Sequence, residues 1–177
     1  MKTDLVVTIT CPDRPGIVER LTEVAVAMSA NWEESRMARL GGDFAGIVRI
    51  SVSQEKAEAL AKALQALADE RTTIAVRIAR PAPAEPVQGH GLYELRLSGA
   101  DHEGIVHEVS AYLAGQGVNV ERMETEVVPG PVSGSPHFKM EAEIRVPPNL
   151  SVSELEAGLD HVAGELGVDI EVRPAQR

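Results

Sequence analysis

The chain has 177 residues, of which 44% are hydrophobic, and a formal net charge of −10. This length accommodates two compact domains of about 80 to 90 residues each, and no apolar run approaches the roughly 20 residues that a membrane-spanning helix needs. The single cysteine excludes an internal disulfide framework. Because the N-terminus does not resemble a signal peptide either, we expect a cytoplasmic protein.

The charge is distributed unevenly along the chain. Residues 1–80 contain 11 Lys/Arg and 11 Asp/Glu, whereas residues 81–177 contain 6 and 16, so the whole acidic excess lies in the second part. Such a surface repels phosphate groups, and direct binding to nucleic acid is therefore not expected. The acidic excess suits a basic protein partner or serves solubility alone.

The first 80 residues predict the element order βαββαβ. Apolar and polar residues alternate over 5–10 and again over 31–40, 44–52 and 72–80, which predicts four strands. Apolar residues at helical spacing predict helices from about Pro15 to Met28 and from 54 to 70. We expect Pro15 in the first helical turn and Asp13 as its cap. Gly41-Gly42-Asp43 predicts a hairpin turn.

The remaining residues repeat this order after a linker. The Pro-rich residues 81–90 predict a semi-rigid linker between a domain at 1–80 and a domain at 91–177. The second domain is expected to contain strands at 91–98, 118–128, 137–146 and 168–173, with helices at 104–116 and 151–166. Its hairpin loop, Pro129 to Pro136, is rich in Pro, Gly and Ser and predicts a mobile flap.

One phrase occurs twice, 88 residues apart, at the first strand-to-helix turn of each half. The segment Thr10 to Val18 returns as Ser98 to Val106, and Asn31 returns as Asn119. A repeat of domain size indicates two copies of one fold. With right-handed crossovers, each copy forms an α+β, ferredoxin-like βαββαβ module, an antiparallel four-stranded sheet with two helices on one face.

The two turns are the strongest candidates for a functional site. Gly16 and Gly104 have no Cβ at the start of a helix, where unpaired N–H groups and the helix dipole favour a carboxylate. Asp13 and Asp101 could bind an ammonium group, so an α-amino acid would match both charges. The alternative is structural, with glycine allowing close packing and aspartate capping the helix.

The repeated phrase resembles the ACT domain, a small-molecule-binding regulatory module, in Asp13 to Val18 with Asn31 and in Asp101 to Val106 with Asn119. The layout as a whole is similar to the glycine cleavage system transcriptional repressor family. The resemblance implies ligand sites at the loop after the first strand, usually completed by a neighbouring module. The candidate binding residues are Cys11, Asp13, Arg14, Gly16, Ile17, Asn31, Asp101, His102, Gly104, Ile105 and Asn119.

Two departures from the family pattern affect these sites. Asn often occupies the position of Asp13 in amino-acid-binding relatives. Glu103 replaces the proline of the first copy and would repel a carboxylate, so the second site is expected to be weaker. Cys11 has two explanations, because a thiol beside a helix N-terminus can be reactive, yet Gly99 at the equivalent place suggests only a small residue.

The sequence contains no pattern for catalysis. No nucleophile elbow occurs, and His102 and His107 lack the spacing of a zinc motif, so we expect no metal, no cofactor and no enzymatic activity. The interpretation is a non-catalytic transcriptional regulator that responds to an amino acid, with glycine one candidate, and acts through a protein partner rather than by direct binding to DNA. We also expect a homodimer. The alternatives are a pure interaction module and a regulatory subunit of a separately encoded metabolic enzyme.

Overall fold

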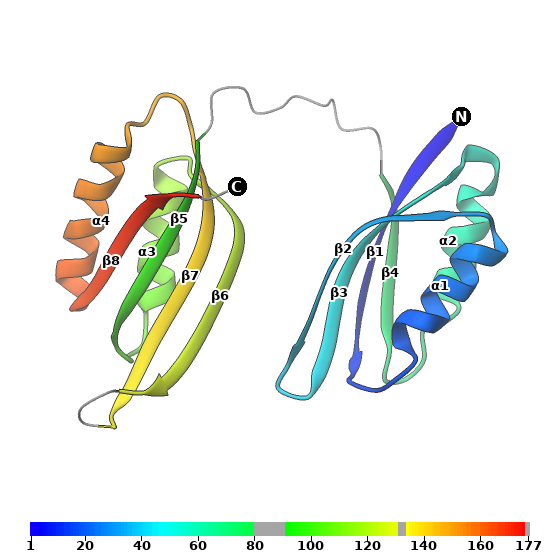
Figure 1. Ribbon diagram of the computed structural model, residues 1–177, viewed down its shortest axis with the longest axis horizontal. Coiled ribbons are helices and arrows are strands. Elements are labelled where there is room, and N and C mark those ends of the chain that lie inside the picture. Colours follow the sequence, from blue (N-terminus) through cyan, green and yellow to red (C-terminus); the bar gives the residue numbers. More distant parts are fainter. Residues whose placement is uncertain (80–90, 131–133, 176–177) are drawn as a thin grey trace. The chain divides into compact units, whose positions relative to one another are not determined.

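The structure is a computed structural model that describes residues 1–79, 91–130 and 134–175. The chain divides into two compact units, Met1–Glu85 and Pro86–Arg177 (Figure 1). The expected linker at 81–90 lies outside the described residues, so the domain limits 1–80 and 91–177 stay a prediction. Within the part of the chain described, no helix is both long and apolar enough to span a bilayer.

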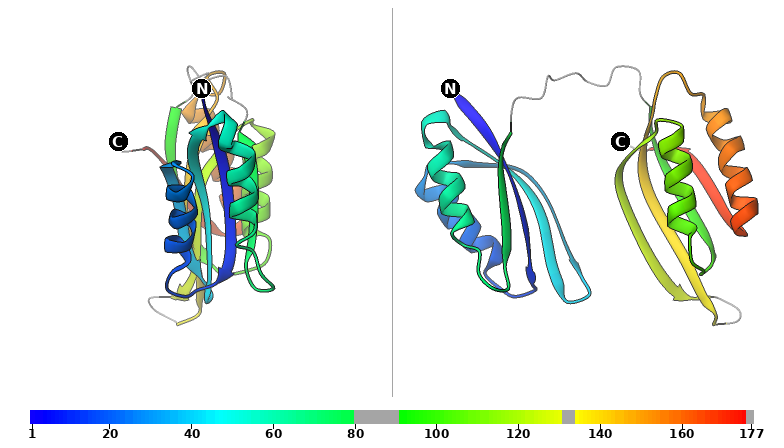
Figure 2. Two further views of the ribbon diagram at one scale, coloured as in Figure 1. Left: turned by 90° about the vertical axis from the view of Figure 1, so that its right-hand side faces the viewer. Right: turned by 180° about the vertical axis from the view of Figure 1, so that it is seen from behind.

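The first unit is an antiparallel four-stranded sheet with the strand order β2-β3-β1-β4. Its two α-helices lie on one side of the sheet, as both views in Figure 2 show. The elements are β1 (Lys2–Pro12), α1 (Ile17–Ala27), β2 (Asn31–Leu40), β3 (Asp43–Ser53), a 3-10 turn (Gln54–Lys56), α2 (Ala57–Gln65) and β4 (Thr73–Ala79).

The second unit repeats this arrangement with the strand order β6-β7-β5-β8. Its elements are β5 (Gly91–Ala100), α3 (Ile105–Gly115), β6 (Asn119–Pro129), β7 (Pro136–Val146), α4 (Val152–Leu166) and β8 (Val168–Pro174). The expectation of two ferredoxin-like modules is therefore confirmed. The predicted flap falls partly on residues 131–133, which lie outside the described residues.

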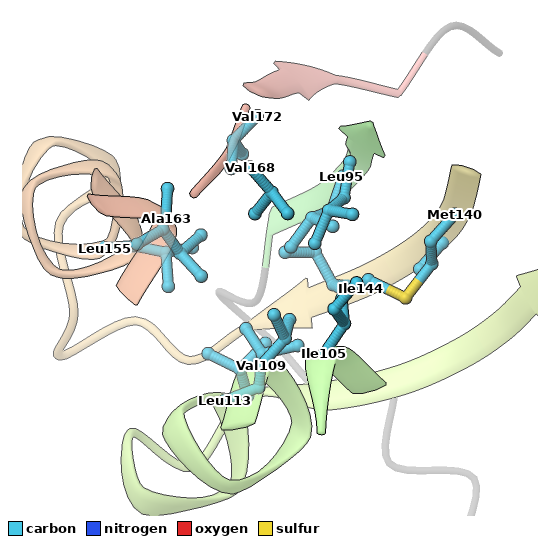
Figure 3. Close-up of a cluster of buried hydrophobic side chains, with 14 of the residues drawn as sticks. Leu95, Ile105, Val109, Leu113, Met140, Ile144, Leu155, Ala163, Val168 and Val172 are labelled. Atoms are coloured by element: carbon cyan, nitrogen blue, oxygen red, sulfur yellow. The ribbon is translucent and has the colours of Figure 1, made fainter. Parts of the chain in front are cut away.

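Each core lies between the sheet and its two helices. In the second unit, one apolar stripe of each helix faces the alternate residues of the central strands (Figure 3). Full burial of a Leu, Ile or Val side chain is worth about 1.5–3 kcal/mol. Each stripe recurs at helical spacing, with Ile105, Val109 and Leu113 from α3, and Leu155, Leu159 and Ala163 from α4.

Three details of the sequence-based prediction are wrong. The helix expected over 54–70 begins as a 3-10 turn and its α-helical part ends at Gln65, because Asp69 and Thr72 pair their backbones in a turn. Asp13 does not cap α1. The N-cap is Gly16, with φ of 88°, and no side chain accepts a hydrogen bond there, so Pro15 also precedes the helix.

Candidate ligand site

The loop between β1 and α1 is held beside the hairpin that joins β2 and β3. The backbone N–H of Asp13 donates to the carbonyl of Gly42 over 2.9 Å. Gly16 then takes a left-handed conformation, and its carbonyl accepts from the N–H of Arg20 at 3.1 Å to begin α1. Because no side chain caps the helix, the N–H groups of its first turn form a position suited to an anion.

Backbone conformation, rather than crowding, explains glycine at position 16. A Cβ built there would meet only the Oε2 atom of Glu19, at 3.8 Å. A positive φ is nevertheless costly for any residue with a Cβ. The counterpart Gly104 has φ of 94° and nothing within 4 Å of a built Cβ. On the side where a Cβ would stand, the approach to the backbone is therefore open at Gly104, whereas at Gly16 it is bordered by the carboxylate of Glu19.

The carboxylate of Asp13 lies at the surface of the first loop. It forms an ion pair with Arg39 on β2, with 2.7 Å between its Oδ2 and the Arg39 Nε atom, and the side chains of Asp13 and Arg39 are 37% and 69% exposed. An ion pair this exposed contributes little to stability. The carboxylate of Asp13 can therefore bind an ammonium group in addition to Arg39 or in exchange for it.

Arg14 braces the first loop against the turn that follows α2. Its Nη2 atom lies 3.5 Å from the carboxylate of Asp69 and donates to Oγ1 of Thr72 at 3.3 Å. The N–H of Arg71, the hydroxyl of Thr72 and the charge of Arg14 hold the pKa of Asp69 below its ordinary value. The guanidinium of Arg14 is thus engaged within the unit.

The loop after β5 has the same construction. The N–H of Asp101 donates to the carbonyl of Pro136 at 3.0 Å, next to the hairpin of the second unit. The carbonyl of Gly104 accepts from the N–H of Glu108 at 3.0 Å, and again no side chain caps the helix. His102 occupies the place of Arg14 and reaches the end of α4, where its Nε2 lies 2.8 Å from the carbonyl oxygen of Leu166.

Three of the candidate residues lie in the cores. Cys11 is 2% exposed and stands within β1 opposite Phe44, not in the turn. Burial raises the pKa of its thiol above the ordinary value, which disfavours the thiolate. Ile17 and Ile105 are also buried and anchor the first turns of α1 and α3. The side chains of these residues thus position the loops from beneath.

The two asparagines lie at the opposite end of each sheet from the loop. Asn31 is opposite Ser51 on β3, whereas the loop follows Pro12, which is opposite Asp43. Eight residues of strand separate these positions, 51 − 43, which corresponds to about 26 Å. Asn31 instead donates to Glu33 at 2.9 Å. Asn119 likewise donates to Glu121, at 3.3 Å.

Sequence reasoning missed the partners of the loop residues. Arg39, Asp69, Thr72 and the carbonyl of Leu166 contact the candidate residues but belong to no recognisable motif. One partner could have been inferred from the topology. The hairpin between β2 and β3 lies beside the end of β1, where Pro12 is opposite Asp43, so Arg39 next to this hairpin could be expected near Asp13. No group of three His, Cys, Asp or Glu side chains within the described ranges is placed to hold a metal ion.

Comparison with known proteins agrees with this architecture. Residues 3–77 match the model of the ACT domain. The glycine cleavage system transcriptional repressor of Escherichia coli (strain K12) is 23% identical over 165 residues, which cover 92% of this chain and 85% of that protein.

Two crystal structures resemble the whole chain. An unknown protein from Galdieria sulphuraria superposes with a TM-score of 0.86 at 35% identity, over 99% of this chain and 100% of that one. A candidate glycine cleavage system transcriptional repressor superposes with a TM-score of 0.70 at 18% identity, over 100% and 99% of the two chains, which supports the fold alone.

Two ferredoxin-like units, each with an uncapped helix start after its first strand, give the chain the architecture of two ACT modules in tandem. The first unit matches the ACT-domain model, the second unit repeats its fold, and the chain as a whole resembles the glycine cleavage system transcriptional repressor family.

Proposed function

We propose that this chain is a non-catalytic, cytoplasmic regulator that binds an amino acid at the loop between β1 and α1 and acts on a protein partner. The observation that carries the proposal is the uncapped start of α1 at Gly16, with the exposed carboxylate of Asp13 three residues before it. Hydrogen-bond donors for a carboxylate and an acceptor for an ammonium group thus share one short loop.

The same chemistry indicates which of the two loops binds more strongly. An α-amino acid would place its carboxylate on the N–H groups of the first turn of α1 and its ammonium group on Asp13. In the second unit, Glu103 adds a negative charge beside Gly104, which opposes a ligand carboxylate. The first unit is therefore the primary site. Glycine is the first ligand to test, because the curated relative is named for the glycine cleavage system.

We propose further that a second copy of the chain completes the site. Asn31 belongs to the candidate set through the resemblance, yet it lies at the far end of β2 from the loop. β2 is an edge strand, so its outer side is available for pairing. Antiparallel pairing of β2 with β2 of another copy would reverse the strand direction, and would place Asn31 of one copy beside the loop end of the other.

The charge distribution favours a protein as the regulated partner. On the open sheet face of the second unit, basic side chains are already engaged by carboxylates, as in the pairs Arg96–Glu94, Lys139–Glu126 and Arg173–Glu171. With a chain net charge of −10, these groups would bind the phosphates of duplex DNA poorly. We therefore propose action through a protein and not through direct contact with DNA.

Calorimetric titration of the full chain with each of the twenty amino acids tests the proposal. Asp13→Ala should weaken binding by about 10- to 150-fold, the equivalent of the ~1.5–3 kcal/mol of a charge-assisted hydrogen bond. Gly16→Val should abolish binding, whereas Gly104→Val should have a smaller effect. Asp43→Ala is the matched control, because it removes the same charge from the adjacent hairpin, where the exposed Asp43 is in no ion pair among those found in the described residues.

Thermal melts of the same variants separate a binding role from a structural one. Asp13 makes no cap, and its ion pair with Arg39 is exposed, so Asp13→Ala should cost at most about 1 kcal/mol of stability. If no amino acid binds the wild-type chain at millimolar concentration, the sensor role is wrong and a pure interaction module replaces it. Tight binding of duplex DNA in the same titration would refute action through a protein alone.

A further inference from the structure

The two units brace equivalent loops with different chemistry. Arg14 and His102 are 88 residues apart, at the same position of the repeat. Each one links the loop after the first strand of its unit to the C-terminal side of the second helix. Arg14 contacts Asp69 and Thr72 in the turn after α2, and His102 contacts Leu166, the last residue of α4. A guanidinium is charged at every relevant pH, whereas an imidazole titrates close to neutrality.

The hydrogen bonds of His102 require two donors. Its Nε2 lies 2.8 Å from the carbonyl oxygen of Leu166, and its Nδ1 lies 2.9 Å from the carbonyl oxygen of Glu103. Carbonyl oxygens only accept hydrogen bonds, and a neutral imidazole has a single N–H. Only the imidazolium form can make both bonds, so loss of its proton leaves one nitrogen lone pair facing a carbonyl oxygen.

The position of Leu166 adds to this preference. Leu166 is the last residue of α4, so its carbonyl is one of those left without a partner inside the helix. The C-terminal end of a helix carries a partial negative charge that stabilises a cation beside it. His102 therefore caps α4 from a loop 64 residues earlier in the chain.

The charged residues nearest in sequence to His102 and to Leu166 are acidic. Asp101 and Glu103 flank His102 in the loop, Glu165, which pairs with His161, precedes Leu166 in the last turn of α4, and Asp169 follows it in β8. The start of α3 opposes them, because a helix N-terminus disfavours a cation. The pKa of His102 lies above the ordinary imidazole value. The largest cause is the hydrogen bond to the backbone of Glu103, followed by the hydrogen bond to the backbone of Leu166 and the charge of Asp101.

We propose that His102 is a proton-dependent clasp that holds the loop of the second unit against the end of α4 while its imidazole is protonated and releases it when the imidazole is neutral. The loop of the first unit, held by Arg14, keeps its conformation across the same pH range. If these loops bind ligands, as the proposed function states, the second site changes with pH and the first does not. The clasp itself does not depend on a ligand.

Imidazole NMR spectra of the full chain, recorded without ligand between about pH 5.5 and 8.5, test the clasp. His102 should titrate above the ordinary imidazole value, and the amides of Gly104 and Gly167 should shift with the same midpoint. His102→Gln should abolish that shift, and His102→Arg should make it independent of pH. His107→Gln is the control, because His107 is exposed on α3 and in no hydrogen bond found among the described residues.

The results separate the clasp from the proposed function. The clasp is overturned if His102 titrates at or below the ordinary imidazole value, or if the amides of Gly104 and Gly167 do not follow it. It is also overturned if His102→Gln keeps the transition that the wild type shows. The wild-type titration alone decides the matter if a variant fails to fold. A chain that binds no amino acid but shows this titration refutes only the proposed function.

Discussion

Ser29 occupies a backbone position that suits glycine, and Ser29→Gly should therefore stabilise the first unit. Ser29 has φ of 56° and is the non-glycine residue with positive φ in the described part of the chain. Its N–H donates to Val26 and the N–H of Ala30 donates to Ala25, both at 2.9 Å, which closes α1 with a Schellman motif. The second unit closes α3 in the same way, with Gly117 at the equivalent position and φ of 69°.

The magnitude follows from two opposing terms. A left-handed conformation destabilises the folded state by about 1–2 kcal/mol for a residue with a Cβ, and glycine removes this strain. Glycine also loses more backbone entropy on folding, which offsets about 0.5–1 kcal/mol of the gain. The lost contact between Lys56 Nζ and Ser29 Oγ is long, at 3.4 Å, and exposed. The net gain is about 0.5–1 kcal/mol, which raises the melting temperature of a unit of this size by about 2–8 °C.

Fluorescence of Trp32 makes the measurement specific to the first unit. Trp32 is the single tryptophan of the chain and packs against the core of that unit. Ser29→Gly should raise the midpoint that it reports, while Gly117→Ser should leave this midpoint in place and lower the unfolding transition of the second unit. An unchanged or lower Trp32 midpoint in Ser29→Gly would refute the argument from backbone strain.

The remaining predictions concern packing and assembly. Gly99→Ala should destabilise the second unit by about 1–3 kcal/mol, because a Cβ there would lie 2.6 Å from Cγ1 and 3.0 Å from Cα of Val168. Circular dichroism melts would detect the loss, and Gly115→Ala, with open space around its Cβ, should cause none. Light scattering should show a dimer at micromolar concentration. Asn31→Ala should leave the dimer intact but weaken amino-acid binding. A stable monomer would refute the proposal that a second copy completes the site.

Much of the fold could be predicted from the sequence because local signals and burial agree. Leu5, Val7 and Ile9 alternate along β1, and all three are buried as the pattern requires. The helices were found from apolar residues three and four positions apart. The end of α2 was missed because Leu67 continues that spacing and packs against the core, although the backbone has already left the helix at Gln65.

The candidate loops were located correctly as strand-to-helix turns, but their internal geometry was not. Asp13 has the chemistry of a cap, and only the positive φ of Gly16 reveals that the helix begins after the glycine. The braces could not be predicted at all. The hydrogen bonds of Arg14 and His102 join residues 58 and 64 positions apart, and no local pattern indicates a contact over such a separation.

The repeat keeps the backbone of the loop and changes the residues around it. Gly16 and Gly104 share one conformation, and Asp13 and Asp101 share one backbone contact with the neighbouring hairpin. The two positions between them differ, as Arg14-Pro15 becomes His102-Glu103. Proline restricts the chain before the first helix and carries no charge, whereas Glu103 adds one and supplies a carbonyl to His102. Two adjacent substitutions thus alter the charge, the rigidity and the titration of a loop whose hydrogen-bonded frame is conserved between the units.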